Sequence, residues 1–218
     1  MPFLSLLLST VLLSSSATRL LAEGVNGVRP LLSVERAEIQ SALPEDTSLL
    51  IEQALIEAFL GSLDSNPPDW AALHGDHGAG QNERLFALNR ERDRLREGQP
   101  DLGRRITFLW YGQLSGFDRD TKGFRVAIGP KFTPTRWGLV RFKPANLPSY
   151  LIVVPPAEVR ESLHAALVRG DRIELSVAMT GRLIPEESIM YAFAHDEPGQ
   201  GLVMPVVRIE RIDYLSLR

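Results

Sequence analysis

Apolar and polar residues alternate with two different periods along the chain, and the period changes close to residue 100. Before that point, apolar positions recur every three or four residues, as in helices that rest one face on a core. After it, they alternate one by one, as in strands with one buried face. The pattern therefore predicts a helical segment over residues 23–100 and a β-rich domain over residues 101–218.

Three helices are predicted in the N-terminal part from their spacing and their start and stop residues. They are expected over residues 33–43, 46–61 and 82–97. Residues 23–32 lack any period, which indicates an irregular leader. Residues 61–81 contain four glycines and a Pro-Pro pair, so they predict a long loop with one helical turn around Trp70 to Leu73.

The C-terminal part alternates as strands do, with one helix among them. The strands are expected over residues 104–114, 124–128, 137–142, 150–154, 173–180, 189–193 and 203–215. The helix starts after Pro155-Pro156 and ends at Gly170, which suits the C′ position. In the last strand the apolar phase shifts, and this predicts a β-bulge near Glu210 or Arg211.

If one of the two weaker strands, 137–142 or 150–154, and the short strand 189–193 are additional, the order is three strands, a helix and two further strands, which resembles the oligonucleotide/oligosaccharide-binding (OB) fold. The resemblance implies an α+β protein in which the helical segment packs on a small, partly open antiparallel β-barrel. The helix lies between strands three and four in such a fold. Strands two and three would then form the ligand-binding face.

The first 22 residues have the pattern of an export signal. The apolar run from Leu4 to Leu13 is too short to span a bilayer, and small residues place cleavage near Ala17 or Ala22. No later stretch is apolar for long enough to cross a membrane, so the mature chain is expected to be periplasmic or secreted. A basic residue before the apolar run is missing, which leaves an uncleaved anchor as an alternative.

The composition excludes several classes of site. The chain contains no cysteine, so disulfides, thiolate catalysis and cysteine metal sites are absent. The formal net charge of −3 predicts no strongly charged partner for the molecule as a whole.

Basic residues nevertheless gather in one stretch, between Lys122 and Lys143, which carries six cations and no acidic residue. Aromatic residues are interleaved, a combination that suits stacking on rings beside anionic groups. The candidate ligand-binding residues are Arg125, Arg136, Trp137, Arg141 and Lys143. The alternative is a solvated strand face whose aromatic residues lie in the core. An exported protein meets anionic glycans, lipid headgroups and envelope proteins more often than nucleic acid, so one of these is the expected partner.

The long loop holds a second candidate site. His74, Asp76 and His77 are residue types that bind a divalent metal, although a zinc site needs further ligands, such as His195 and Asp196. The alternative is a polar loop without a ligand.

Three functional hypotheses follow. The first is a non-enzymatic exported binding or envelope protein without a cofactor. The second is a metal-dependent hydrolase in which the metal activates a water molecule. The third is a structural interaction module that uses the seam of Leu85, Leu88 and Leu95.

Overall fold

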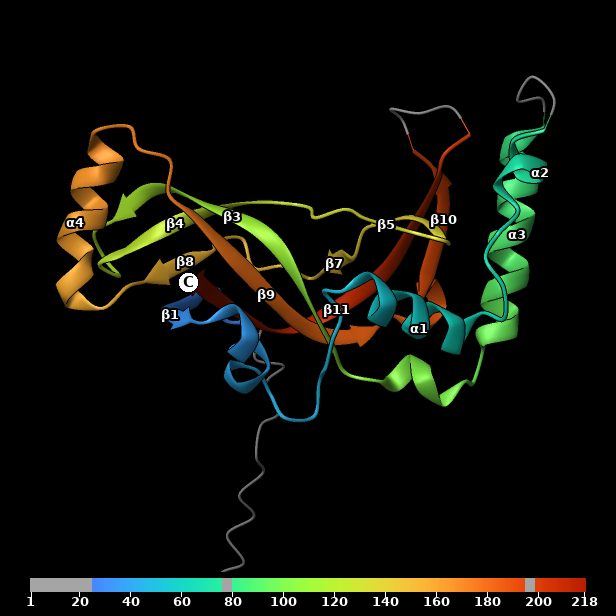
Figure 1. The fold of residues 1–218 in the computed structure, drawn as a ribbon, viewed down its shortest axis with the longest axis horizontal. Helices are drawn as coiled ribbons and strands as arrows, with labels where there is room; N and C mark the ends of the chain where they lie inside the picture. The colour runs from blue at the N-terminus through green and yellow to red at the C-terminus, as the bar shows by residue number, and fades with distance from the viewer. Residues whose placement is uncertain (1–24, 76–79, 195–198) are drawn as a thin grey trace, which may run out of the picture.

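The computed structural model describes residues 25–75, 80–194 and 199–218, which fold around a closed six-stranded β-barrel with further strands and helices outside it (Figure 1). The strands are β1 (Val28–Val34), β2 (Ser48–Leu49), β3 (Ile106–Asp118), β4 (Gly123–Gly129), β5 (Thr133–Thr135), β6 (Gly138–Val140), β7 (Lys143–Ala145), β8 (Ile152–Val154), β9 (Glu174–Leu183), β10 (Ile189–Phe193) and β11 (Gly201–Leu217). The α-helices are α1 (Gln53–Leu63), α2 (Trp70–His74), α3 (Gln81–Arg96) and α4 (Ala157–Val168). Three 3₁₀ helices are η1 (Arg36–Ala42), η3 (Pro100–Gly103) and η4 (Pro185–Glu187).

The barrel is closed by β1, which lies between β8 and β11 and is parallel to both. The remaining neighbours, β8–β4–β3–β9–β11, are all antiparallel. The sequence predicts a partly open barrel, and this expectation is wrong because β1 occupies the gap between β8 and β11. An α+β protein with a β-barrel is confirmed.

The predictions for residues 25–43 are wrong. The expected irregular leader contains β1, and the expected helix from Ser33 is replaced by the end of β1 and the 3₁₀ helix η1. Pairing with two strands that lie more than a hundred residues further along the chain supplies partners for the backbone of β1, with Leu31 opposite Tyr214 and Val28 opposite Ile152. Such long-range pairing overrides the local pattern.

Most of the remaining elements are confirmed. The short turn of helix at Trp70 is α2, the helix after the long loop is α3, and the helix after Pro155-Pro156 is α4. Gly170 follows α4 with φ of 86°, as expected for its C′ position. Helix α1 starts at Gln53 instead of residue 46, because Ser48–Leu49 pairs with β3 as β2.

The longest strand, β11, belongs to the barrel only in its C-terminal half. Its first residues pair with β10, β6 and β7 outside the barrel, and Val207 to Leu215 pair with β9. The register shifts between Ile209 and Arg211, which confirms the predicted bulge. The bulge lies within the part of β11 that pairs with β9, after Val207 to Ile209 have already joined the ladder.

Two apolar clusters stabilise this arrangement. The larger one fills the barrel and includes the stacked rings of Phe108 and Phe142, whose centroids are 4.8 Å apart. The smaller one lies on the outer side of the sheet, where Ile39 and Leu43 cover Leu109 and Leu215. Strand alternation explains both, because successive side chains of β3 and β11 point to opposite faces.

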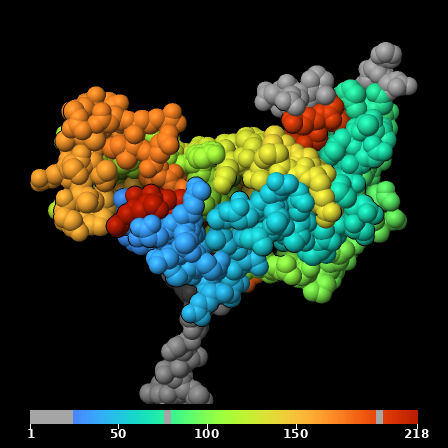
Figure 2. Space-filling view, in the orientation of Figure 1, coloured from blue at the N-terminus to red at the C-terminus, as the bar shows by residue number. Residues whose placement is uncertain are grey.

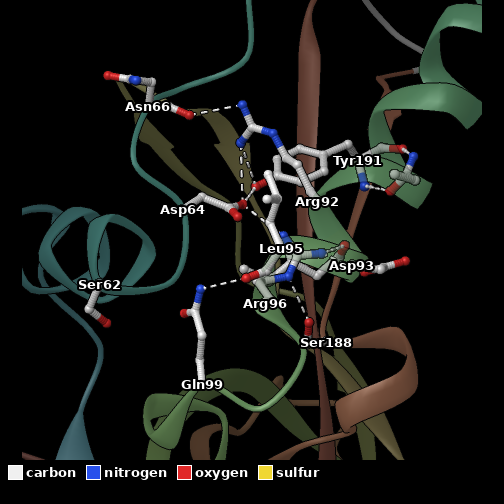
Figure 3. A network of polar contacts seen from close by, with 12 residues as sticks. Ser62, Asp64, Asn66, Arg92, Asp93, Leu95, Arg96, Gln99, Ser188 and Tyr191 are labelled. Atoms are coloured by element: carbon white, nitrogen blue, oxygen red, sulfur yellow. Dashed lines mark hydrogen bonds and ion pairs between the residues drawn. The ribbon is translucent and has the colours of Figure 1, made fainter.

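A buried ionic network fixes α3 to β10 (Figure 3). The Arg96 side chain is fully buried and donates hydrogen bonds to Asp64 Oδ2 at 2.7 Å, Asp93 Oδ1 at 2.6 Å, Ser188 Oγ at 2.9 Å and the Ile189 carbonyl at 3.1 Å. The four acceptors come from the end of α1, from α3 itself and from β10 with the residue before it. One guanidinium therefore joins three segments that are far apart in the sequence.

Asp64 is the common acceptor of this network. Its Oδ2 also accepts from Arg92 at 3.2 Å and from the hydroxyl of Tyr191. Burial, and next the adjacent Asp64 carboxylate, raise the pKa of Tyr191, so the phenol stays protonated and acts as a donor. Asn89 completes the attachment by bonding both the backbone N–H and the carbonyl of Tyr191.

Substituting Asp64 by Asn should destabilise the fold strongly, because it removes the one buried carboxylate that both Arg92 and Arg96 bond and leaves the fully buried Arg96 with only the partly exposed Asp93 as an anionic partner. The expected loss in the free energy of unfolding is about 3–5 kcal/mol, measured by urea denaturation. The matched control is Asp101→Asn in the exposed pair with Arg104, for which a loss below about 1 kcal/mol is expected. Equal losses for the two variants would contradict a structural role for the network.

Candidate functional site

Two cations of the basic stretch lie together on the outer side of β11. The Arg141 backbone N–H bonds the Val203 carbonyl at 2.9 Å, and Lys143 stands opposite Val206 in the pairing of β7 with β11. Phe142, between them, points into the barrel and stacks on Phe108. Because side chains alternate along an extended chain, Arg141 and Lys143 both point away from the core.

Thioethers and one aromatic ring surround these cations. The Arg141 guanidinium donates to Met204 Sδ at 3.2 Å and lies 5.9 Å from the centre of the Phe132 ring. Lys143 Nζ lies 3.7 Å from Met190 Sδ. We call this surface the basic face, defined by Arg141, Lys143, Phe132, Met190 and Met204.

The cations of the basic face lack a strong acceptor. Neither forms an ion pair with a carboxylate of the described residues, and Arg141 Nε is buried there without a hydrogen-bond partner. A thioether is only a weak acceptor. A bound anion would supply the charge-assisted hydrogen bonds that these donors do not make within the fold.

The backbone of the basic face is held in place by Asn146. Its side chain donates to the Ile209 carbonyl at 3.0 Å and accepts from the Ile209 N–H at 2.9 Å. Asn146 itself adopts a left-handed conformation with φ of 53°, which asparagine tolerates better than most residues. This two-way bond attaches the short strand β7 to β11 and so sets the position of Lys143.

Sequence reasoning missed Arg208 as a neighbour of this face. Arg208 is exposed, pairs with Ala145 across the β7–β11 ladder, and lies on the same side of β11 as Val206. The signal was present, because Arg208 stands between the core residues Val207 and Ile209 in an alternating strand. Met190 and Met204 carried no such signal, since only the pairing of β10 with β11 brings them beside the cations.

The other three candidate residues lie elsewhere. Arg125, on β4, is 61% exposed and lies 4.0 Å from Asp118. Arg136 pairs with Glu57 on α1 at 3.4 Å, and its backbone N–H also bonds Glu57. Trp137 is fully buried in the core, as in the alternative interpretation of the aromatic residues. The structure therefore brings together only Arg141 and Lys143 of the five.

The Glu57 carboxylate is ionised and bonds Arg136 through both its side chain and its backbone N–H. A hydrogen bond from Gln53, and next the backbone N–H of Arg136, hold the pKa of Glu57 below its ordinary value. The group therefore stays ionised at neutral pH, and Arg136 keeps an anionic partner within the chain. The cations of the basic face differ from Arg136 in this respect.

Of the metal candidates, only His74 lies within the described residues, whereas Asp76, His77, His195 and Asp196 lie outside them. The His74 ring packs edge-on against Phe193 at 5.6 Å, and its carbonyl accepts from Arg84 at 2.7 Å. Among the described residues, no group of three or more histidines or acids is placed to hold a metal ion.

The leucine seam of α3 is divided between core and surface. Leu85 and Leu88 pack against the main core, and Leu95 is 60% exposed.

No helix in the described part of the chain is both long and apolar enough to cross a membrane.

Comparison with protein-family models, curated proteins and solved structures finds no match for this chain. Only its own residues therefore bear on its function.

Proposed function

We propose that this chain is an exported, non-enzymatic binding protein whose basic face holds an anionic group of a glycan or a lipid headgroup. The observation that carries the proposal is the pair Arg141 and Lys143, two adjacent cations whose side-chain acceptors within the described fold are thioethers. Other arginines of the basic stretch have carboxylate neighbours, as Arg136 does. Unsatisfied donors of a charged group favour an external anion.

The topology supports an OB-like interpretation of the barrel. Strands β3, β4 and β8 pair in succession, α4 follows, and β9 then returns to the side of β3, as in a Greek key. Helix α4 thus stands between the third and fourth of the five strands β3, β4, β8, β9 and β11. Strand β1 would be an addition that fills the space between the third and the fifth. OB-like barrels bind oligosaccharides and oligonucleotides, which favours a binding role over catalysis, although the basic face lies at β7 and β11 and not on the second and third strands, β4 and β8, where the resemblance places the ligand.

The export part of the proposal rests on the first 22 residues, which combine a short apolar run with small residues near Ala17 and Ala22. Sequencing the N-terminus of the protein from the extracytoplasmic fraction of its host should give a chain that begins at Thr18 or Glu23. A chain that still begins at Met1 would contradict cleavage.

Neutralising the basic face by Arg141→Gln with Lys143→Gln should abolish retention on an anionic surface. Each lost charge-assisted hydrogen bond is worth about 1.5–3 kcal/mol, so the affinity should fall at least about tenfold per residue. The probes are a sulfated polysaccharide resin and vesicles of phosphatidylglycerol, and the readout is the salt concentration needed for elution or release. Loss on the resin alone indicates a glycan, and loss on the vesicles alone indicates a headgroup.

The matched control is Arg125→Gln with Arg136→Gln, which removes two exposed cations from the same stretch. This variant should be retained like the unaltered protein, and both double variants should keep its melting temperature. Equal weakening by the two variants would show that retention follows net charge and would overturn the proposal.

The metal-dependent hydrolase is a second candidate, favoured by one observation. His74 Nδ1 is buried and has no hydrogen-bond partner among the described residues, so it is a nitrogen suited to a metal ligand. If this candidate is correct, protein purified without chelators carries about one equivalent of a transition metal, and His74→Ala with His77→Ala removes it. Elemental analysis by mass spectrometry measures this, and metal-free unaltered protein rejects the candidate.

A further inference from the structure

A concave surface lined by Tyr111 lies on the outer side of β3, β4 and β9. It is a groove of about 660 Å³, within the range of small-molecule sites. The side chains that matter for its chemistry are those of Tyr111, Gln113, Arg172, Glu174 and Ser176. In Figure 2 the strand segments that line it, in green, orange and red, meet the blue N-terminal region. We call it the Tyr111 groove.

No large side chain stands directly opposite Tyr111 on either strand beside it. In the barrel ladder Tyr111 stands between Gly129 on β4 and Ser176 on β9, two small residues, and it is 60% exposed. Aromatic residues in sheets normally pack against large cross-strand neighbours. The small neighbours leave the ring uncovered, and an uncovered tyrosine ring offers an apolar surface with a polar tip.

Hydrogen-bonding side chains surround this ring. Gln113 is the next outward residue of β3, and it pairs with Glu174 on β9 and with Ala127 on β4. Ser176 adds a hydroxyl beside the ring. An amide, a carboxylate and a hydroxyl around an aromatic surface match a sugar, because its ring stacks by its C–H face while its hydroxyls both donate and accept.

The charge of the groove favours a neutral ligand. Its one cation, Arg172, is paired with its one anion, Glu174, at 2.8 Å. A nucleic-acid strand would need cations along the groove for its phosphates. A smaller groove of about 320 Å³ shares Tyr111 and Ser176 with it and is lined further on by Arg36, Glu52 and Lys131, so its charges are not balanced and the neutral ligand is assigned to the larger groove.

We propose that the Tyr111 groove binds a neutral sugar ring of a glycan, with the ring stacked on Tyr111 and its hydroxyls bonded to Gln113, Glu174 and Ser176. The site is separate from the basic face. None of the residues that line the groove is among the five that define the basic face, whose cations lie beside the first half of β11. Loss of binding at one site should therefore leave binding at the other unchanged.

The test uses the full chain on an array of immobilised neutral oligosaccharides, with single-stranded oligothymidylate as the nucleic-acid probe. The unaltered protein should be retained on at least one neutral oligosaccharide. Tyr111→Ala should weaken that binding about tenfold or more, as loss of a stacking ring does elsewhere, and Tyr111→Trp should keep it.

A second variant blocks the ring without removing it. Gly129→Val places a side chain beside Tyr111, and a Cβ at Gly129 meets no heavy atom within 4 Å, so the variant should fold normally. It should nevertheless weaken oligosaccharide binding, because the isopropyl group would project from the position directly opposite Tyr111 into the open space beside the ring. Gly112 does not serve this purpose, since a Cβ there would lie 2.8 Å from Leu175 and Val177.

Two controls separate this site from other effects. Tyr150 is 68% exposed and does not line the groove, so Tyr150→Ala should leave the binding unchanged. Arg141→Gln with Lys143→Gln should also leave it unchanged, even if anion binding is lost. Three results overturn the inference: retention of no neutral oligosaccharide, equal retention of Tyr111→Ala, or Tyr111-dependent retention of oligothymidylate alone.

Discussion

The buried pair of Asp64 and Arg96 is the contact on which the outer part of the molecule depends. It joins the end of α1, helix α3 and the start of β10, three segments that have no backbone ladder in common. Both groups are buried, so removing either one leaves the other with a single, more exposed partner, Asp93 for Arg96 or Arg92 for Asp64, and this should be strongly destabilising. Helix α3 has a polar sequence with few apolar anchors, so polar contacts take over the role that an apolar face has in most helices.

The network also connects the interior to the basic face through one strand. On β10, Ile189 and Tyr191 face the core and α3, whereas Met190, between them, lies beside Lys143 on the opposite side. Fixing Tyr191 through Asp64 and Asn89 therefore fixes Met190 as well. The two cations then rest on thioethers at defined positions, and their charge stays available to a partner from outside the chain.

Most elements of the β-rich part could be predicted from the sequence, because alternation and turn residues depend only on neighbouring positions along the chain. The bulge between Ile209 and Arg211 and the helix ended by Gly170 are examples. Strand β1 could not be read, since its residues show no alternation and its partners, Ile152 and Tyr214, lie more than a hundred residues away. Closure of the barrel followed from β1 and was missed with it.

The candidate site was readable only as a stretch of charge. The sequence marks Arg125, Arg136, Arg141 and Lys143 alike, and what separates them is the location of carboxylates from other segments, such as Glu57 for Arg136. The Tyr111 groove gave no signal at all, because an exposed tyrosine depends on the size of its cross-strand neighbours. Only the register of β3 with β4 and β9 shows that these are Gly129 and Ser176.

The most direct measurement of the central claim is a crystal structure of the protein with a sulfated disaccharide bound. Our account predicts sulfate oxygens within about 3 Å of the Arg141 guanidinium and of Lys143 Nζ, in place of the contacts with Met204 and Met190. A disaccharide bound at Arg125 or Arg136, with the basic face unchanged, would contradict it.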